Sequence, residues 1–138
     1  QIVCGGSVDV LRKAGGKEVL YPIENSDGLP FDCSDFLFGQ GYQAVKRALA
    51  EGETARAWFF ADDYLALGGM KALSESGRRI GRDVWLYGLY NTRVGRFSIY
   101  PVNSSSQMLE EMVVWLLEHL KNPNPERKCL IPDILIRS

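Results

Sequence analysis

Short apolar runs alternate with amphipathic segments along this chain, and the alternation constrains its fold more than any other feature. Runs bounded by Gly, Asp or Pro are typical of strands, and apolar residues repeating every three to four positions are typical of helices. Strand-like runs lie at 1–4, 17–23, 55–61, 83–89, 97–102 and 129–138, and helix-like segments at 7–16, 39–52, 63–77 and 105–121. This order predicts an α/β fold, with a mostly parallel open sheet and helices on both faces.

Two segments refine the prediction. The run ARAWFFA at 55–61 is apolar without interruption, as expected for a central parallel strand covered on both faces. Residues 24–37 are rich in Asp, Ser, Gly and Pro, so we expect a loop before the helix at 39–52.

The chain opens directly on the strand-like QIVCGG without a methionine. We therefore expect it to be part of a longer protein.

Composition argues against several classes of protein. The 138 residues carry a net charge of −1, so there is no basic excess of the kind that nucleic-acid or membrane binding uses. Cys4, Cys33 and Cys129 have no metal-type spacing, which favours reduced thiols in a cytoplasmic protein. Neither a signal peptide nor a membrane-spanning run is visible. Since no catalytic motif occurs either, we expect a protein that is not an enzyme, with no metal and no cofactor.

Two adjacent carboxylates, Asp62 and Asp63, follow the apolar run in FFADDYLALGGMKAL. The carboxyl ends of strands in an open α/β sheet are where ligands bind. One carboxylate suffices to cap the following helix, and we assign this role to Asp63. Asp62 would then face a cleft and accept hydrogen bonds from a ligand. The alternative, that both are solvated cap residues, stays open.

A longer pattern surrounds this pair. Residues 55–91 read ARAWFFADDYLALGGMKALSESGRRIGRDVWLYGLYN, with an apolar strand, an acidic pair, the helix motif ALGGxxAL and then DVxxxG before a turn. The segment resembles the effector-binding core of the lactose-repressor (LacI/GalR) family of transcription regulators. Weaker similarity continues through SDFLFGQGYQAVKRAL at 34–49, through 99–120 and through CLIPDILIRS at 129–138. The resemblance is good over residues 34–138 and poor over 1–33.

The resemblance implies a partial effector-binding domain over residues 1–138. It would comprise the C-terminal subdomain of a periplasmic-binding-protein-like fold plus a crossover helix at 105–121. A small-molecule effector, sugar-like or another metabolite, would bind in the cleft between subdomains of a homodimer. DNA would be bound only through a helix-turn-helix domain that is absent here. A periplasmic sugar-binding protein of a transport system is the alternative, and a receiver-like or small enzyme domain is a third.

The resemblance also assigns site residues. Asp62 matches a family position that contacts the effector, and Phe36 matches an aromatic that stacks on it, although a core phenylalanine is an equal alternative. Tyr90 stands where the family usually carries an acidic residue. A phenol cannot hold two hydroxyls as a carboxylate does, so we expect the effector not to be bound as the usual pyranose. Asn103 matches a position near the crossover that is often Gln.

Two surfaces are expected to mediate self-association. In the family, the helix equivalent to 63–77 contributes to the dimer, which here implicates Tyr64, Leu67 and Lys71. The helix at 105–121 is apolar around most of its circumference, and such a helix is normally buried on several sides. We therefore expect it to pack against a second copy when no other subdomain covers it.

Overall fold

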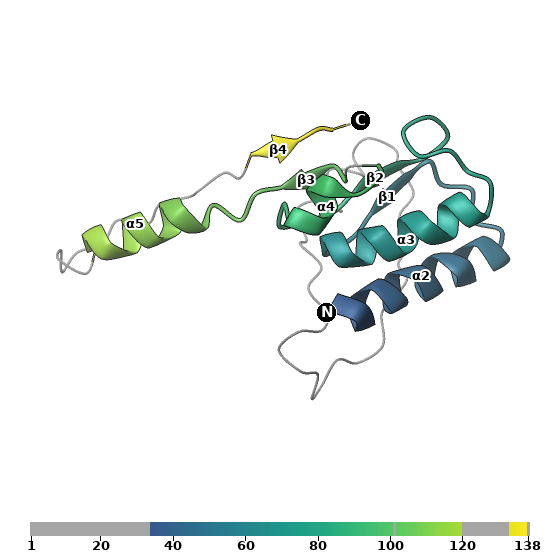
Figure 1. The fold of residues 1–138 in the computed structure, drawn as a ribbon, viewed down its shortest axis with the longest axis horizontal. Helices are drawn as coiled ribbons and strands as arrows, with labels where there is room; N and C mark the ends of the chain where they lie inside the picture. The colour runs from purple at the N-terminus through teal and green to yellow at the C-terminus, as the bar shows by residue number, and fades with distance from the viewer. Residues whose placement is uncertain (1–33, 101, 120–132, 138) are drawn as a thin grey trace, which may run out of the picture.

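The computed structural model of the protein describes residues 34–100, 102–119 and 133–137 (Figure 1). The predicted elements at 1–4, 7–16 and 17–23 lie outside these residues. The elements follow in the order α2 (Ser34–Ala50), β1 (Ala57–Phe59), α3 (Asp63–Glu75), β2 (Trp85–Tyr87), α4 (Arg93–Phe97), β3 (Ser104–Ser105), α5 (Leu109–His119) and β4 (Ile134–Leu135).

Strands β1 and β2 form a parallel pair in which Ala57 lies opposite Trp85 and Phe59 opposite Tyr87. Helix α3 connects them, so the three elements make a β-α-β unit. A parallel bridge between Tyr87 and Asn103 brings a third segment alongside β2. The parallel arrangement predicted from the alternating pattern is therefore confirmed at these strands.

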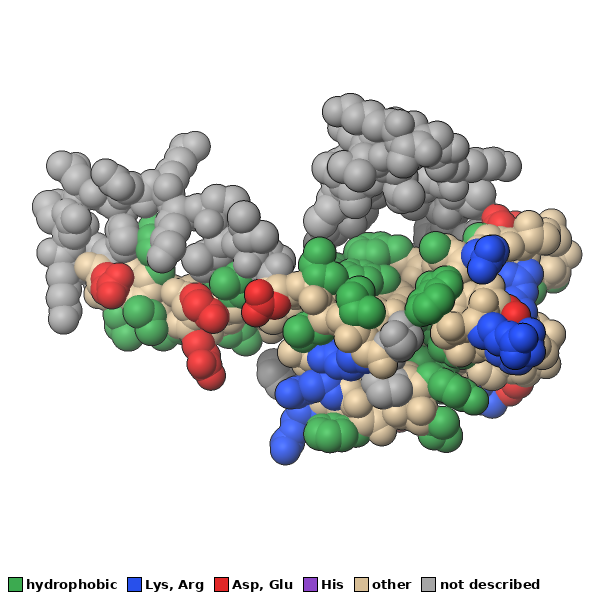
Figure 2. Space-filling model, turned by 90° about the horizontal axis from the view of Figure 1, so that it is seen from above, with side chains coloured by type: hydrophobic (Ala, Val, Ile, Leu, Met, Phe, Trp, Pro, Cys, Tyr) green, Lys and Arg blue, Asp and Glu red, His purple; other side chains and the backbone are tan. Residues whose placement is uncertain are grey.

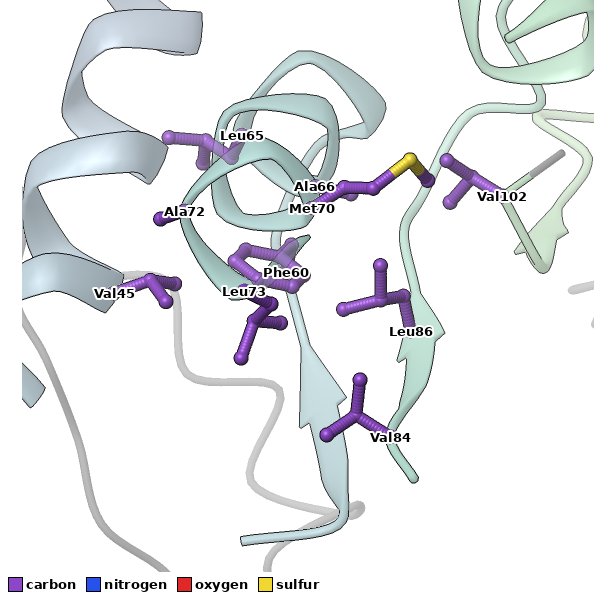
Figure 3. Packing of buried hydrophobic residues seen from close by; sticks show 10 residues of the cluster. All are labelled: Val45, Phe60, Leu65, Ala66, Met70, Ala72, Leu73, Val84, Leu86 and Val102. Atoms are coloured by element: carbon purple, nitrogen blue, oxygen red, sulfur yellow. The ribbon is translucent and has the colours of Figure 1, made fainter. Parts of the chain in front are cut away.

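The core lies between this pair and two helices (Figure 3). Helix α3 packs on the strands and α2 packs on α3, and the two helices run side by side in the same direction (Figure 1). The buried apolar residues are Val45, Phe60, Leu65, Ala66, Met70, Ala72, Leu73, Val84, Leu86 and Val102. The ring of Phe60 lies at the centre of this group, between the residues of α3 and those of β2 (Figure 3).

The contact between α2 and α3 depends on glycines. A Cβ atom on Gly41 would lie 2.1 Å from the carbonyl oxygen of Leu65, and one on Gly68 would lie 1.9 Å from that of Phe38. Both clashes are with backbone atoms, which cannot move aside as a side chain can. The sequence SDFLFGQGY thus continues as a helix because its glycines allow a close helix pair.

Helix α2 begins at Ser34, so the helix predicted at 39–52 is confirmed over 39–50, but it begins earlier, inside the expected loop. The Asp, Ser, Gly and Pro residues of 24–37 favoured that loop. Packing of α2 against α3, with Gly41 buried in the contact, outweighs this local preference. Phe36 consequently lies in the first turn of a helix and not in a loop.

The strand predicted at 97–102 was also wrong. Residues Arg93–Phe97 form the short helix α4, which begins after Thr92 because the Thr92 hydroxyl accepts a hydrogen bond from the Gly95 backbone N–H. The N-cap hydrogen bond therefore favours a helix that includes Phe97, the first residue of the predicted strand. Phe97 and Ile99 are solvent-exposed, with 81% and 91% of their surface accessible.

Helix α5 extends away from the rest of the described structure (Figure 1). It begins at Leu109, later than the predicted residue 105, since Ser104 and Ser105 form β3 and pair antiparallel with β4; residues 120 and 121 of the prediction lie outside the described residues. Apolar residues on several sides of α5 are exposed: Leu109, Met112, Val113, Val114, Leu116 and Leu117. The expectation of a broad apolar surface on this helix is confirmed.

The face of the strands away from α2 is apolar and accessible (Figure 2). Phe59 is 59% exposed and Trp85 43% exposed. The rings of Phe59 and Tyr87 stack with their centroids 5.6 Å apart and 15° between their planes. Burial of the 55–61 run on both faces is therefore not seen at Phe59 in the described residues.

Replacement of Gly41 by Ala is expected to destabilise the protein by about 1–3 kcal/mol, because the added methyl overpacks the α2–α3 contact. Gly39→Ala is the matched control, since no atom lies within 4 Å of a Cβ at that position of the same helix. The control should be neutral or stabilise by roughly 0.5–1 kcal/mol. Thermal melting measures both, and equal melting temperatures for the two variants would contradict the packing argument.

Candidate functional site

Polar residues from three neighbouring segments meet at the carboxyl end of the parallel strands. Asp62 and Asp63 follow β1, residues 88–92 follow β2, and Ser104 lies in β3. Because the carboxyl ends of parallel strands share one edge of the sheet, this is the edge where a ligand would bind, and we call it the ligand edge. The N-terminus of α2, with Phe36, lies at the same end as that of α3, since Gly41 contacts Leu65 and the helices run in parallel (Figure 1).

Asp62 is the N-cap of α3. Its backbone is extended, and its Oδ1 accepts a 2.6 Å hydrogen bond from the Tyr64 backbone N–H. The prediction that Asp63 caps the helix is therefore wrong. The residue preceding the first helical turn has the extended backbone that lets its side chain reach back to the N–H groups, and that residue is Asp62.

The electrostatics of Asp62 suit a site at the surface. Partial burial raises the pKa of its carboxyl above the ordinary value, and the neighbouring Asp63 carboxylate adds to the rise. The hydrogen bonds from the Tyr64 and Leu65 backbone act in the opposite direction. The carboxyl is thus half-buried at the ligand edge while one oxygen remains engaged in the cap.

Asp63 is fully buried, which the sequence did not indicate. Its Oδ2 accepts hydrogen bonds from the backbone N–H of Thr92 at 2.6 Å and from the Thr92 hydroxyl at 3.0 Å. Its Oδ1 accepts a 2.8 Å bond from the Ser104 hydroxyl. A buried carboxylate is costly unless its oxygens are satisfied, and here three donors from two segments satisfy them.

Tyr90 and Asn91 lie in a turn after β2 with an uncommon backbone. Their φ angles are 86° and 49°, in the left-handed region that residues other than glycine rarely adopt. Such conformations cost on the order of 1–3 kcal/mol each and persist where the surroundings enforce them. The Tyr90 side chain is 44% exposed at the ligand edge, so its phenol is available to a ligand.

Asn103 is buried and its carboxamide makes internal hydrogen bonds. Its Nδ2 donates to the Leu86 carbonyl at 3.0 Å, and its Oδ1 accepts from the Arg137 backbone N–H at 2.7 Å. The Arg137 guanidinium donates to the carbonyl of Val102 and to the side chain of Asn91. Asn103 thus joins β2 to the segment that contains β4, and its contact with a ligand stays a prediction.

A hollow of about 270 Å³ lies beside β2. Its lining includes Ile80, Trp85, Leu86, Tyr100, Asn103 and Arg137. Of the four predicted ligand residues only Asn103 lines it. The structure therefore brings Asp62, Tyr90 and the helix that carries Phe36 to one edge, and Asn103 to the hollow beside β2.

Within residues 34–100, 102–119 and 133–137, no three His, Cys, Asp or Glu side chains come together as metal ligands would. Over the same residues, none of the helices is long and apolar enough to cross a membrane. The side chains at the ligand edge are carboxyl, hydroxyl, amide and phenol groups, which recognise polar molecules through hydrogen bonds.

The Asp62 carboxyl is expected to titrate above its ordinary pKa of 3.8. Because the folded state then holds the proton more tightly than the unfolded state, Asp62 makes the protein less stable as pH rises from 3.8 through its folded pKa. Asp62→Asn keeps a good N-cap and should remove this dependence. A carbon-detected NMR titration of the carboxyl gives the pKa directly, and a midpoint at or below 3.8 would show that burial does not dominate.

No family model matches the chain. Several curated proteins are similar to it, among them two repressors. The HTH-type transcriptional repressor MelR of Bacillus subtilis (strain 168) is 28% identical over 106 residues, which are 74% of this chain and 31% of the repressor. The lactose operon repressor of Escherichia coli (strain K12) is 32% identical over 102 residues, 70% of this chain and 27% of the repressor. The chain spans about a third of the length of the curated relatives it matches.

Solved structures agree with the sequence relatives. The lac repressor dimer bound to operator and the anti-inducer ONPF superimposes with a TM-score of 0.53 at 33% identity, over 59% of this chain and 30% of that one. A LacI family transcriptional regulator from Arthrobacter sp. FB24, in complex with lactose, matches with a TM-score of 0.71 over 88% of this chain and 41% of that one. Its 21% identity bears on the fold alone. The homologues of the chain are thus LacI-family repressors, and the structures that it matches are LacI-family regulators, so by sequence and by fold it is similar to the lactose-repressor (LacI) family.

Proposed function

We propose that this chain is a ligand-sensing part of a transcriptional regulator and forms one wall of its effector site. The observation that carries the proposal is the convergence of Asp62 and the Tyr90–Asn91 turn at the carboxyl end of two adjacent parallel strands. Effector binding would change the populations of the DNA-binding and non-binding forms of the whole regulator. The chain would be the C-terminal subdomain of the effector-binding domain, with α5 as the crossover helix.

The effector is a small polar molecule, such as a sugar or another metabolite. The anti-inducer bound in the lac repressor structure supports this class. Tyr90 argues for a difference from the usual sugar contact, because a phenol offers one donor and one acceptor where a carboxylate could accept from two hydroxyls. Phe36 would supply an aromatic face against the ligand.

DNA binding would require a helix-turn-helix domain in a longer protein, and the regulator would act in the cytoplasm, where it can reach DNA. The two relatives described above are repressors. They favour a transcriptional regulator over the alternative, a periplasmic sugar-binding protein. The chain is not proposed to catalyse a reaction.

Dimerisation is proposed through the face of α3 with Tyr64, Leu67 and Lys71. These residues are spaced three and four apart, so they share one side of the helix. Lys71 is exposed and forms an ion pair with Glu75, whereas Tyr64 and Leu67 are partly buried. The surface therefore has an apolar part and a charged rim, as protein interfaces commonly do.

Effector recognition by Asp62 is testable because its cap role can be separated from its charge. In the full-length protein, Asp62→Ala should weaken effector binding by ~1–3 kcal/mol through loss of a charged hydrogen-bond partner. Asp62→Asn should also weaken binding although it retains the cap. The effector is first found by thermal shift with sugars, nucleobases and small acids, and affinities are then measured by calorimetry.

Glu51→Gln is the matched control for charge, because Glu51 is exposed beyond the C-terminal end of α2, away from the site. The control should bind the effector as the unchanged protein does. Wild-type affinity in both Asp62 variants would show that Asp62 does not contact the effector. A full-length protein that binds none of the compounds would count against the whole proposal.

Self-association through α5 is expected for the chain of residues 1–138. Val113 and Leu117 are four residues apart and each is more than half exposed, so burial against a second copy removes apolar surface from water. Multi-angle light scattering should give a dimer, and Val113→Glu combined with Leu117→Glu should shift it towards monomer. Glu110→Gln on the same helix should have no effect. A wild-type monomer at high concentration would contradict this expectation.

A further inference from the structure

The buried carboxyl of Asp63 fits in its place because two of its neighbours, Gly88 and Gly95, have no side chain. A Cβ atom on Gly88 would lie 2.3 Å from its Oδ1, and one on Gly95 would lie 2.9 Å from its Oδ2. Any larger residue at Gly88 would therefore displace the carboxyl. Within residues 34–100, 102–119 and 133–137 it forms no ion pair, and hydroxyl and backbone donors alone hold it.

The donors to Asp63 come from the end of the turn after β2 and from β3. Thr92 follows the turn directly and donates twice to Oδ2. Ser104 donates to Oδ1, and the same hydroxyl oxygen accepts a 2.9 Å hydrogen bond from the backbone N–H of Asn91. Asp63 thus fixes Thr92 directly and Asn91 through Ser104.

These bonds explain how the turn keeps its uncommon backbone. Tyr90 and Asn91 have positive φ angles. Asn tolerates this conformation better than most residues, whereas Tyr does not, so the conformation of Tyr90 depends on its surroundings. The hydrogen bonds at Asn91 and Thr92 pin the backbone immediately after Tyr90. The direction in which Tyr90 presents its phenol therefore depends on Asp63, although Asp63 is buried away from any ligand.

We propose that Asp63 is a positioning residue for the effector site: it holds the Tyr90–Asn91 turn in its left-handed conformation and couples it to β3. The inference rests on the proposed effector-binding role of that turn. Since β3 precedes α5 in the chain, the same carboxyl ties the ligand edge to the segment leading into the proposed crossover helix. A displacement of the turn on ligand binding would then be transmitted to β3.

The direction of the hydrogen bonds makes the proposal specific. The Ser104 hydroxyl donates its proton to Asp63, which leaves its oxygen to accept from Asn91. In Asp63→Asn, the remaining oxygen can still accept from Thr92, but the amide group that replaces the other oxygen donates and cannot accept from Ser104. The variant has nearly the same shape, removes the charge, and leaves the Ser104 hydroxyl proton without its acceptor on residue 63.

Amide hydrogen exchange of the full-length protein tests the positioning role without any ligand. Asp63→Asn, Ser104→Ala and Thr92→Val should each speed exchange in residues 88–96 by ~10-fold or more, the effect of losing about one buried hydrogen bond. Exchange in residues 34–50 of α2 should stay unchanged. Thr92→Ser retains the hydroxyl that Thr92→Val removes, and it should restore slow exchange.

Unchanged exchange in residues 88–96 would overturn the inference, because it would show that Asp63 does not restrain the turn. Equal acceleration in α2 would also overturn it, because it would indicate general destabilisation. Titration with lactose, followed by calorimetry, is the second measurement. If the full-length protein binds lactose, Asp63→Asn should lower its affinity and Thr92→Ser should not. If no sugar, nucleobase or small acid binds while exchange responds as expected, the positioning of the turn stands and the proposed effector function fails.

Discussion

The arrangement at the ligand edge depends on the burial of one carboxyl group. Asp63 has no exposed surface, so its oxygens must find donors within the protein. Those donors are Thr92 and Ser104, and they bring the turn after β2 and the start of β3 to the end of β1. The neighbouring residue, Asp62, remains partly exposed because the cap of α3 uses only backbone donors.

A second constraint is the close contact of α2 with α3, which Gly41 and Gly68 permit. It aligns the N-terminal ends of both helices with the ligand edge, so Phe36 lies at the same end of the molecule as Asp62. The apolar surfaces of α5 and of the strands around Phe59 are exposed in the described residues. Surfaces of this kind fit a chain that covers about a third of its relatives' length.

The alternation of patterns was sufficient to predict the α/β class, the parallel pair and the helix after Asp62. It was not sufficient to decide which carboxylate caps that helix, because adjacent aspartates have equal preference for the position and only the buried donors distinguish them. The start of α2 was missed because the Asp, Ser, Gly and Pro residues of 24–37 favour a loop locally, whereas the packing that stabilises the helix involves Leu65, which is distant in sequence. At 97–102 a strand was predicted from apolar residues, but the helix α4 that Thr92 caps includes the first of them, Phe97.

The proposed function requires that a small-molecule effector binds at the carboxyl end of β1 and β2. Backbone amide NMR of the full-length protein, during titration with the effector found by screening, locates the bound molecule. The largest chemical-shift changes are expected on Asp62, Tyr90 and Asn91. Changes concentrated instead on Trp85 and Tyr100, which line the hollow beside β2, would contradict this site.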